Sequence, residues 1–107
     1  MAIAHEHEVP VVVDGAAMLP PADNLTKYIA DGADLVTFSG GKGVRGPQST
    51  GILAGRADLV EAARLNMSPH ASVGRACKVA KEEIAGLLAA LDRFVTMDHE
   101  AEWATWR

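Results

Sequence analysis

The sequence predicts an α/β fold, in which helices flank part of a mainly parallel sheet and a third strand runs antiparallel to the second. Short apolar runs at residues 9–13 and 35–38 are typical of buried strands, and a helical period lies between them. A glycine-rich stretch then leads directly to a third apolar run. With 107 residues, of which 49% are hydrophobic and 22% charged, the chain can bury one core and is expected to fold.

The first half of the chain predicts a strand, a helix and a second strand. Residues 9–13 read Val-Pro-Val-Val-Val, which is typical of a strand buried on both faces, and a helix end at residues 2–7 precedes it. Residues 24–31 place apolar side chains on one helical face, and Gly32 supplies a stop. Residues 35–38 are a second strand, also expected to be buried on both faces. A right-handed crossover through the helix makes it parallel to the first.

The second half predicts one more strand and two helices. The glycines and proline of residues 40–51 leave no room for a crossover helix, so the strand at residues 51–54 should be antiparallel to the second. Amphipathic periods predict helices at residues 57–65 and 78–95. The tail, residues 97–107, holds both tryptophans without a clear period and is either a docking segment or a frayed end.

Composition excludes several classes of function. The net charge is −4 and aromatic residues make up 5%, so the chain offers neither a basic face nor a stacking platform for nucleic acid. It has no membrane-length apolar run and no basic then apolar leader, so we expect a soluble cytoplasmic protein without a membrane partner.

Cys77 cannot form an internal disulfide and should be a small, partly buried residue. The His and Glu residues at 5–8 are better explained as a polar helix end than as metal ligands, so no metal site is predicted.

Asp14 and Lys42 are the residues that can carry chemistry, because each follows the carboxyl end of a predicted parallel strand. Ligands of open α/β sheets bind at that edge. Neighbouring strands lie about 4.8 Å apart, so the two side chains could face opposite ends of a small aromatic ring. Pyridoxal phosphate requires such a pair, an amine for its aldehyde and an acid that keeps the ring nitrogen protonated. Taken alone, the pair is explained more simply as a solvated lysine and a turn aspartate.

Nucleotide motifs are not supported. Residues 41–46 satisfy G-x-G-x-x-G, but Pro47 and a strand follow where a helix should open. A phosphate loop of the G-x-x-x-x-G-K-[ST] type also fails, because Val36 occupies the place of its first glycine.

The wider string is more specific. It comprises Val-Val-Val-Asp-Gly-Ala-Ala at residues 11–17, Gly-Ala-Asp-Leu-Val-Thr-Phe-Ser-Gly-Gly-Lys at 32–42 and Arg-Gly-Pro-Gln-Ser-Thr-Gly at 45–51. It resembles the selenocysteine-synthase-like family of fold-type I pyridoxal-phosphate enzymes, which includes L-seryl-tRNA(Sec) selenium transferase and D-glucosaminate-6-phosphate ammonia lyase. The resemblance implies that residues 1–96 are the central segment of the large domain and that residues 97–107 are a tail.

Site roles follow from the resemblance by matching position. Lys42 would form the Schiff base with pyridoxal phosphate, and Asp14 would be the partner of the pyridine nitrogen, which makes these two the catalytic residues. Ala16 would pack under the cofactor ring, and Ser39 would bind its phosphate. The remaining candidates are three donors to the phosphate of a neighbouring subunit's cofactor and two substrate contacts, namely Gln48, Ser49 and Thr50, then Arg45 and Arg75. Arg75 is equally well explained as part of a solvated helix start.

The resemblance implies a pyridoxal-phosphate-dependent lyase that acts by β-elimination on an amino acid or amino-sugar acid. The chain would be a fragment of a larger, homo-oligomeric enzyme, since the family's amino-terminal part and small domain are missing. Gly41 and Arg45 favour the lyase, because the selenium transferases carry an acidic residue before the lysine and no arginine three residues after it. Two alternatives stay open. One is a selenium transferase, with tRNA as partner, and the other is a non-catalytic remnant that associates with a partner subunit.

Overall fold

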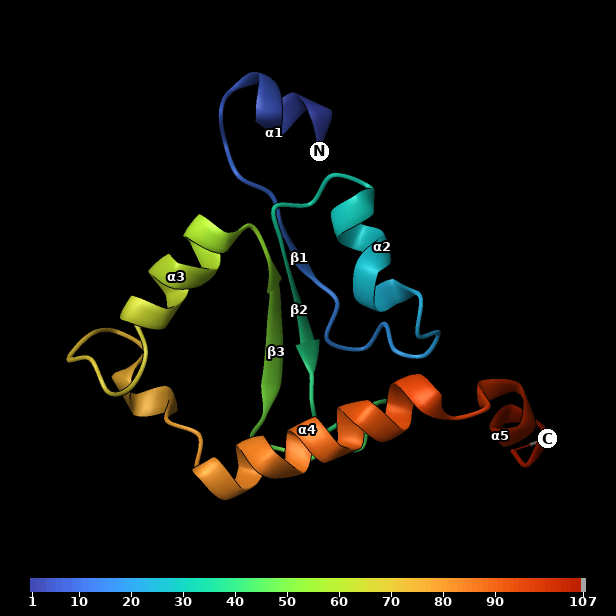
Figure 1. The fold of residues 1–107 in the computed structure, drawn as a ribbon. Coiled ribbons are helices and arrows are strands. Elements are labelled where there is room, and N and C mark those ends of the chain that lie inside the picture. Colours follow the sequence, from blue (N-terminus) through green and yellow to red (C-terminus); the bar gives the residue numbers. More distant parts are fainter. Residues whose placement is uncertain (107) are drawn as a thin grey trace.

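The computed structural model describes residues 1–106, in which three strands form one sheet with helices around it (Figure 1). β1 (Val12–Asp14) pairs in parallel with β2 (Leu35–Ser39), and β2 pairs antiparallel with β3 (Gly51–Gly55). The predicted α/β fold class, with a parallel first pair and an antiparallel third strand, is therefore confirmed. The helices are α1 (Ala2–Glu6), α2 (Asn24–Ala30), α3 (Ala57–Leu65), the short 3-10 helix η1 (Arg75–Cys77), α4 (Lys81–Thr96) and α5 (His99–Ala104).

β1 begins at Val12 rather than at residue 9, because the earlier backbone donors have other partners. The Val9 amide donates to the Ala4 carbonyl of α1 at 2.9 Å, and Pro10 has no N–H. The Val11 amide donates to the Asp34 carboxylate at 2.7 Å. The sheet ladder is therefore confined to the last residues of the apolar run.

Asp34 is a buried carboxylate that joins the amino-terminal helix to the sheet. Besides the Val11 amide, it accepts from His5 Nε2 at 2.8 Å and from Arg56 Nη1 at 2.9 Å. These hydrogen bonds, with the Val11 amide as the largest cause, hold the pKa of the Asp34 carboxyl well below its usual range. This contact between α1, the start of β1 and the end of β3 was not predicted from the sequence.

The core lies on one face of the sheet. Val36 and Phe38 of β2 point into it, and Phe94 of α4 packs on them together with Leu19 and Val44. Apolar side chains of α2 and α4 complete this layer. Figure 1 shows α2 and α3 on opposite sides of the sheet, and α4 across the end where β2 finishes.

The expectation that both parallel strands are buried on both faces is correct for β2 and wrong for β1. Alternate residues of a strand point to opposite faces. Val13 packs against the core, whereas Val12 on the other face is 58% exposed and Leu53 of β3, on that same face, is 37% exposed. Nothing in residues 1–106 covers this side of β1.

The helices follow the predicted periods closely, apart from the start of α4 and the two short helices η1 and α5, which no period predicts. α4 begins at Lys81 rather than at residue 78, because Ala80 is extended and its amide donates to Glu83 Oε2 at 2.9 Å. Residues 99–104 of the tail form α5, which Asp98 caps by accepting from the Ala101 amide at 3.0 Å. This helix is docked on the core, because His99 Nε2 donates to the Phe94 carbonyl at 2.9 Å. Cys77 is exposed rather than partly buried. Within residues 1–106, no helix has the length and apolar character needed to cross a membrane.

Candidate active site

Asp14 is the last residue of β1 and lies beside Thr37 of β2 in the parallel register. Its Oδ1 accepts from the Ala16 amide at 3.0 Å, so the carboxylate turns back over the residues that follow the strand. Gly15 keeps this turn close to β2: its amide donates to the Thr37 carbonyl at 2.9 Å, and a β-carbon there would lie 3.0 Å from the Phe38 ring. The Asp14 side chain stays exposed at the carboxyl edge of the sheet.

Lys42 lies in the lysine loop, residues 40–46, which follows β2. The loop closes on itself, because the Gly46 amide donates to the Gly40 carbonyl at 2.7 Å and the Arg45 amide to the Lys42 carbonyl at 2.9 Å. Its glycines serve close packing: a β-carbon on Gly43 would lie 2.1 Å from the Leu19 carbonyl oxygen. The Lys42 side chain is exposed.

The three predicted phosphate donors all make hydrogen bonds within the chain. Gln48 Nε2 donates to the Gly41 carbonyl at 2.9 Å, and the Thr50 hydroxyl donates to the Pro47 carbonyl at 2.6 Å. Ser49 donates to the carboxylate of Glu83 on α4. The Ser49 hydroxyl and the Ala80 amide hold the pKa of the Glu83 carboxyl below its usual value. These residues therefore shape the lysine loop and its junction with α4.

The remaining candidates divide between two places. Ala16 and Ser39 are half-buried at the carboxyl edge of β1 and β2, where Asp14 and the lysine loop also lie. Arg75 donates to the Ser68 hydroxyl at 3.3 Å, and η1 lies on the α3 side of the sheet (Figure 1). The structure thus brings Asp14, Ala16, Ser39 and the lysine loop to one edge, and it leaves Arg75 outside this group.

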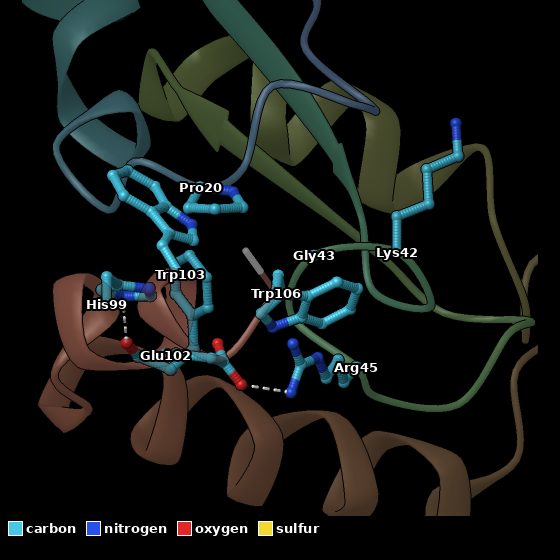
Figure 2. Close-up of a pocket in the computed structure, with 9 residues that line it drawn as sticks. Pro20, Lys42, Gly43, Arg45, His99, Glu102, Trp103 and Trp106 are labelled. Atoms are coloured by element: carbon cyan, nitrogen blue, oxygen red, sulfur yellow. Dashed lines mark hydrogen bonds and ion pairs between the residues drawn. The ribbon is translucent and has the colours of Figure 1, made fainter.

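A cavity of about 520 Å³ lies behind the lysine loop, between the loop and α5. Figure 2 shows Arg45 and Trp106 facing each other there, while the Lys42 side chain points away from the cavity. Arg45 Nη1 donates to Glu102 Oε1 at 2.5 Å. Glu102 and His99, which also line this cavity, were not among the predicted site residues. The aspartate at position 98 followed by acidic residues in a first turn is the local signal that would have predicted their helix.

The donor set at the sheet edge fits pyridoxal phosphate, the cofactor that the resemblance implies. Asp14 Oδ1 is occupied by the Ala16 amide, and within residues 1–106 its second oxygen accepts no hydrogen bond. Over the same residues, the Lys42 amine makes no ion pair. A carboxylate at the end of β1 can therefore accept from a protonated ring nitrogen, and an accessible amine in the loop that follows β2 can meet an aldehyde. The same described residues hold no group of three metal-ligating side chains.

Comparison with known proteins gives one family and three kinds of related enzyme. The family model for L-seryl-tRNA selenium transferase matches residues 1–105. A 5'-C-glycyluridine monooxygenase-decarboxylase of a Streptomyces species is 40% identical over 94% of this chain and 23% of its own length. D-glucosaminate-6-phosphate ammonia lyase of Salmonella typhimurium is 34% identical over 86% of this chain and 23% of its own length.

The solved structure of a D-glucosaminate-6-phosphate ammonia-lyase superposes with a TM-score of 0.77 and 31% identity. The match covers 91% of this chain and 24% of that one. The chain therefore spans about a quarter of the length of the relatives that it matches.

Proposed function

Because this chain belongs to the L-seryl-tRNA selenium transferase family, we propose that it carries the cofactor-binding lysine and the pyridine-nitrogen partner of a pyridoxal-phosphate-dependent enzyme. The relatives are enzymes, among them an ammonia lyase, a monooxygenase-decarboxylase and selenium transferases. The observation that supports the proposal best is the parallel register of β1 and β2, since it sends Asp14 and the lysine loop to the same sheet edge. In this proposal, residues 1–96 are the central segment of a large domain and residues 97–107 are its tail.

When bound, pyridoxal phosphate supplies an electron-accepting ring that stabilises negative charge on the α-carbon of an amine substrate. The Asp14 carboxylate holds a proton at the pyridine nitrogen, and the Ala16 amide orients that carboxylate. Lys42 Nζ would hold the cofactor by condensing with its aldehyde. Once a substrate amine displaced it from that carbon, the released Lys42 amine would be free to take the proton from the substrate α-carbon. Ala16 would pack under the ring, and the Ser39 hydroxyl would bind the phosphate.

For the reaction we propose β-elimination from an amino acid or amino-sugar acid. The likeness to an ammonia lyase in both sequence and structure supports this reaction. A selenium transferase is the second candidate, because the matching family model bears that description and a relative from Desulfovibrio desulfuricans is 34% identical. Only in that case would tRNA be a partner.

A non-catalytic role is the third candidate, and the exposed face of β1 and β3 supports it. Val12 and Leu53 share this apolar face, which would suit a partner subunit of the same or a related chain. In an oligomer, the Ser49 hydroxyl could donate to the cofactor phosphate of a neighbour only if it released Glu83.

Borohydride reduction of the full chain with added pyridoxal phosphate, followed by peptide mass spectrometry, tests the proposal. The reduced cofactor should be attached mainly to Lys42, and Lys42→Ala should remove it. Lys81→Ala is the matched control. The Lys81 side chain is 90% exposed on α4, so this variant also removes an accessible lysine but should leave attachment at Lys42 unchanged. Attachment scattered over the exposed lysines, or unchanged in Lys42→Ala, would contradict the proposal.

A further inference from the structure

Arg45 has an unusual backbone within the lysine loop. Its φ is +61°, and it is the only residue of the loop with a positive φ. Glycine adopts this left-handed conformation freely, whereas a side chain makes it unfavourable. The loop contains glycines at positions 40, 41, 43 and 46, yet an arginine stands at the one position where the backbone favours glycine. The arginine side chain must therefore supply contacts that offset the strain.

Those contacts are on the tail of the chain. Arg45 Nη1 donates to Glu102 Oε1 at 2.5 Å, and its guanidinium carbon lies 5.5 Å from the ring centre of Trp106 (Figure 2). The Glu102 side chain is 21% exposed and that of Arg45 43%, so the ion pair is only partly in water. A guanidinium over an indole face adds a cation–π attraction to the ion pair.

α5, which carries Glu102, is itself fixed to the core. His99 Nε2 donates to the Phe94 carbonyl at 2.9 Å, and the two rings meet edge to face at 4.6 Å. Phe94 is fully buried among the core residues. Asp98 caps the first turn of the helix. A continuous set of contacts thus leads from the core through α5 to Arg45 and the lysine loop.

We propose that Glu102 is a positioning residue, which holds the lysine loop in place through Arg45. The turn that Arg45 closes begins at the Lys42 carbonyl, so a shift of Arg45 is transmitted to Lys42 through three peptide units. The ion pair between Arg45 and Glu102 limits the directions in which the Lys42 amine can point. In this way α5 supports the lysine loop from behind. The value of this restraint for catalysis rests on the proposed function, whereas the restraint itself does not.

The first measurement is amide hydrogen exchange in the full chain without cofactor, with Glu102→Gln as the variant. The amides of Arg45 and Gly46 report the two hydrogen bonds that close the loop. They should exchange about two- to fivefold faster, the factor expected for loss of one ion pair near the surface. The second measurement is labelling of lysine amines with limiting acetic anhydride. The labelling rate of Lys42, divided by that of Lys81 as internal reference, should change by a similar factor. The urea midpoint should fall by no more than about 1 M, because a two- to fivefold factor corresponds to about 0.4–1 kcal/mol.

Glu100→Gln is the matched control, because Glu100 is exposed on the same helix and makes no side-chain hydrogen bond or ion pair within residues 1–106. The exchanged pair, Arg45→Glu with Glu102→Arg, should restore both readouts to within about twofold of the original chain, which a merely structural role of α5 would not predict. Unchanged exchange and labelling in Glu102→Gln, or no rescue by the exchanged pair, would overturn the proposal.

Attachment of the reduced cofactor to Lys42, measured after borohydride treatment, separates the two proposals. Faster loop exchange in Glu102→Gln, without any attachment to Lys42 in the original chain, would support the positioning role of Glu102 and refute the proposed function. Attachment to Lys42, with unchanged loop exchange in Glu102→Gln, would support the proposed function and refute the positioning role.

Discussion

Replacing Gly43 by alanine should strain the lysine loop from within. A β-carbon there would lie 2.1 Å from the Leu19 carbonyl oxygen, whereas ordinary contact begins near 3.4 Å, so the two backbones must separate by about 1.3 Å. Leu19 belongs to the buried cluster, and the separation therefore disturbs the core. Overpacking of this kind lowers the free energy of unfolding by about 1–3 kcal/mol.

Urea unfolding followed by circular dichroism measures this loss. With a slope of about 1 kcal/mol per molar urea, the midpoint should fall by about 1–3 M. Gly51→Ala is the control, since a β-carbon there would lie 3.4 Å from the Phe38 carbonyl oxygen, and its effect should stay within about 0.5 kcal/mol. The Gly43→Ala variant should also lose cofactor attachment at Lys42. Equal midpoints for the two alanine variants would refute the reasoning.

Three further outcomes are expected. Phe94→Ala removes a buried ring and should lower the free energy of unfolding by about 3–5 kcal/mol in the same urea assay. Leu88→Ala changes a side chain that is 62% exposed and should lower it by about 0.5 kcal/mol or less. Equal losses would contradict the assigned core. Because the pKa of Asp34 is lowered in the folded chain, its contribution to stability is present above the ordinary carboxyl pKa, about 4, and is lost as the pH falls below it. Urea midpoints between pH 6 and pH 3 should therefore fall more steeply in the original chain than in Asp34→Asn, and parallel curves would count against the network. Asp14→Asn should leave the urea midpoint unchanged, since the side chain is exposed, but lower the yield of reduced cofactor at Lys42; an unchanged yield would argue against Asp14 as the nitrogen partner.

Much of the fold could be predicted because the relevant signals are local. α3 has the bounds that its apolar period predicts, and Gly32, with φ of +105°, ends α2 as expected. The crossover rule correctly made β1 and β2 parallel, and the short glycine-rich connection correctly made β3 antiparallel. The shared edge of Asp14 and the lysine loop follows from that topology, while the roles of these residues stay predictions.

Errors arose wherever a backbone or side chain had two possible partners. The start of β1 depends on whether the Val11 amide joins a ladder or the carboxylate of Asp34, 23 residues away. In the same way, the hydrogen bond that Ser49 donates to Glu83 spans 34 residues and could not be predicted from local sequence, while the phosphate role of Ser49 stays a prediction. Local periodicity carries no information about such choices.

By itself the sequence determined the order and type of the main elements, and it pointed to Asp14 and Lys42, because propensity, turn residues and strand connection act over short distances. Only the tertiary structure decided that residues 99–104 form a helix docked behind the lysine loop and that Arg45 pairs with Glu102, 57 residues away. It also gave Arg75 a partner in Ser68. The physical reason is that hydrogen bonds and ion pairs between distant segments form only after the core around Phe94 has set the positions of α4 and α5.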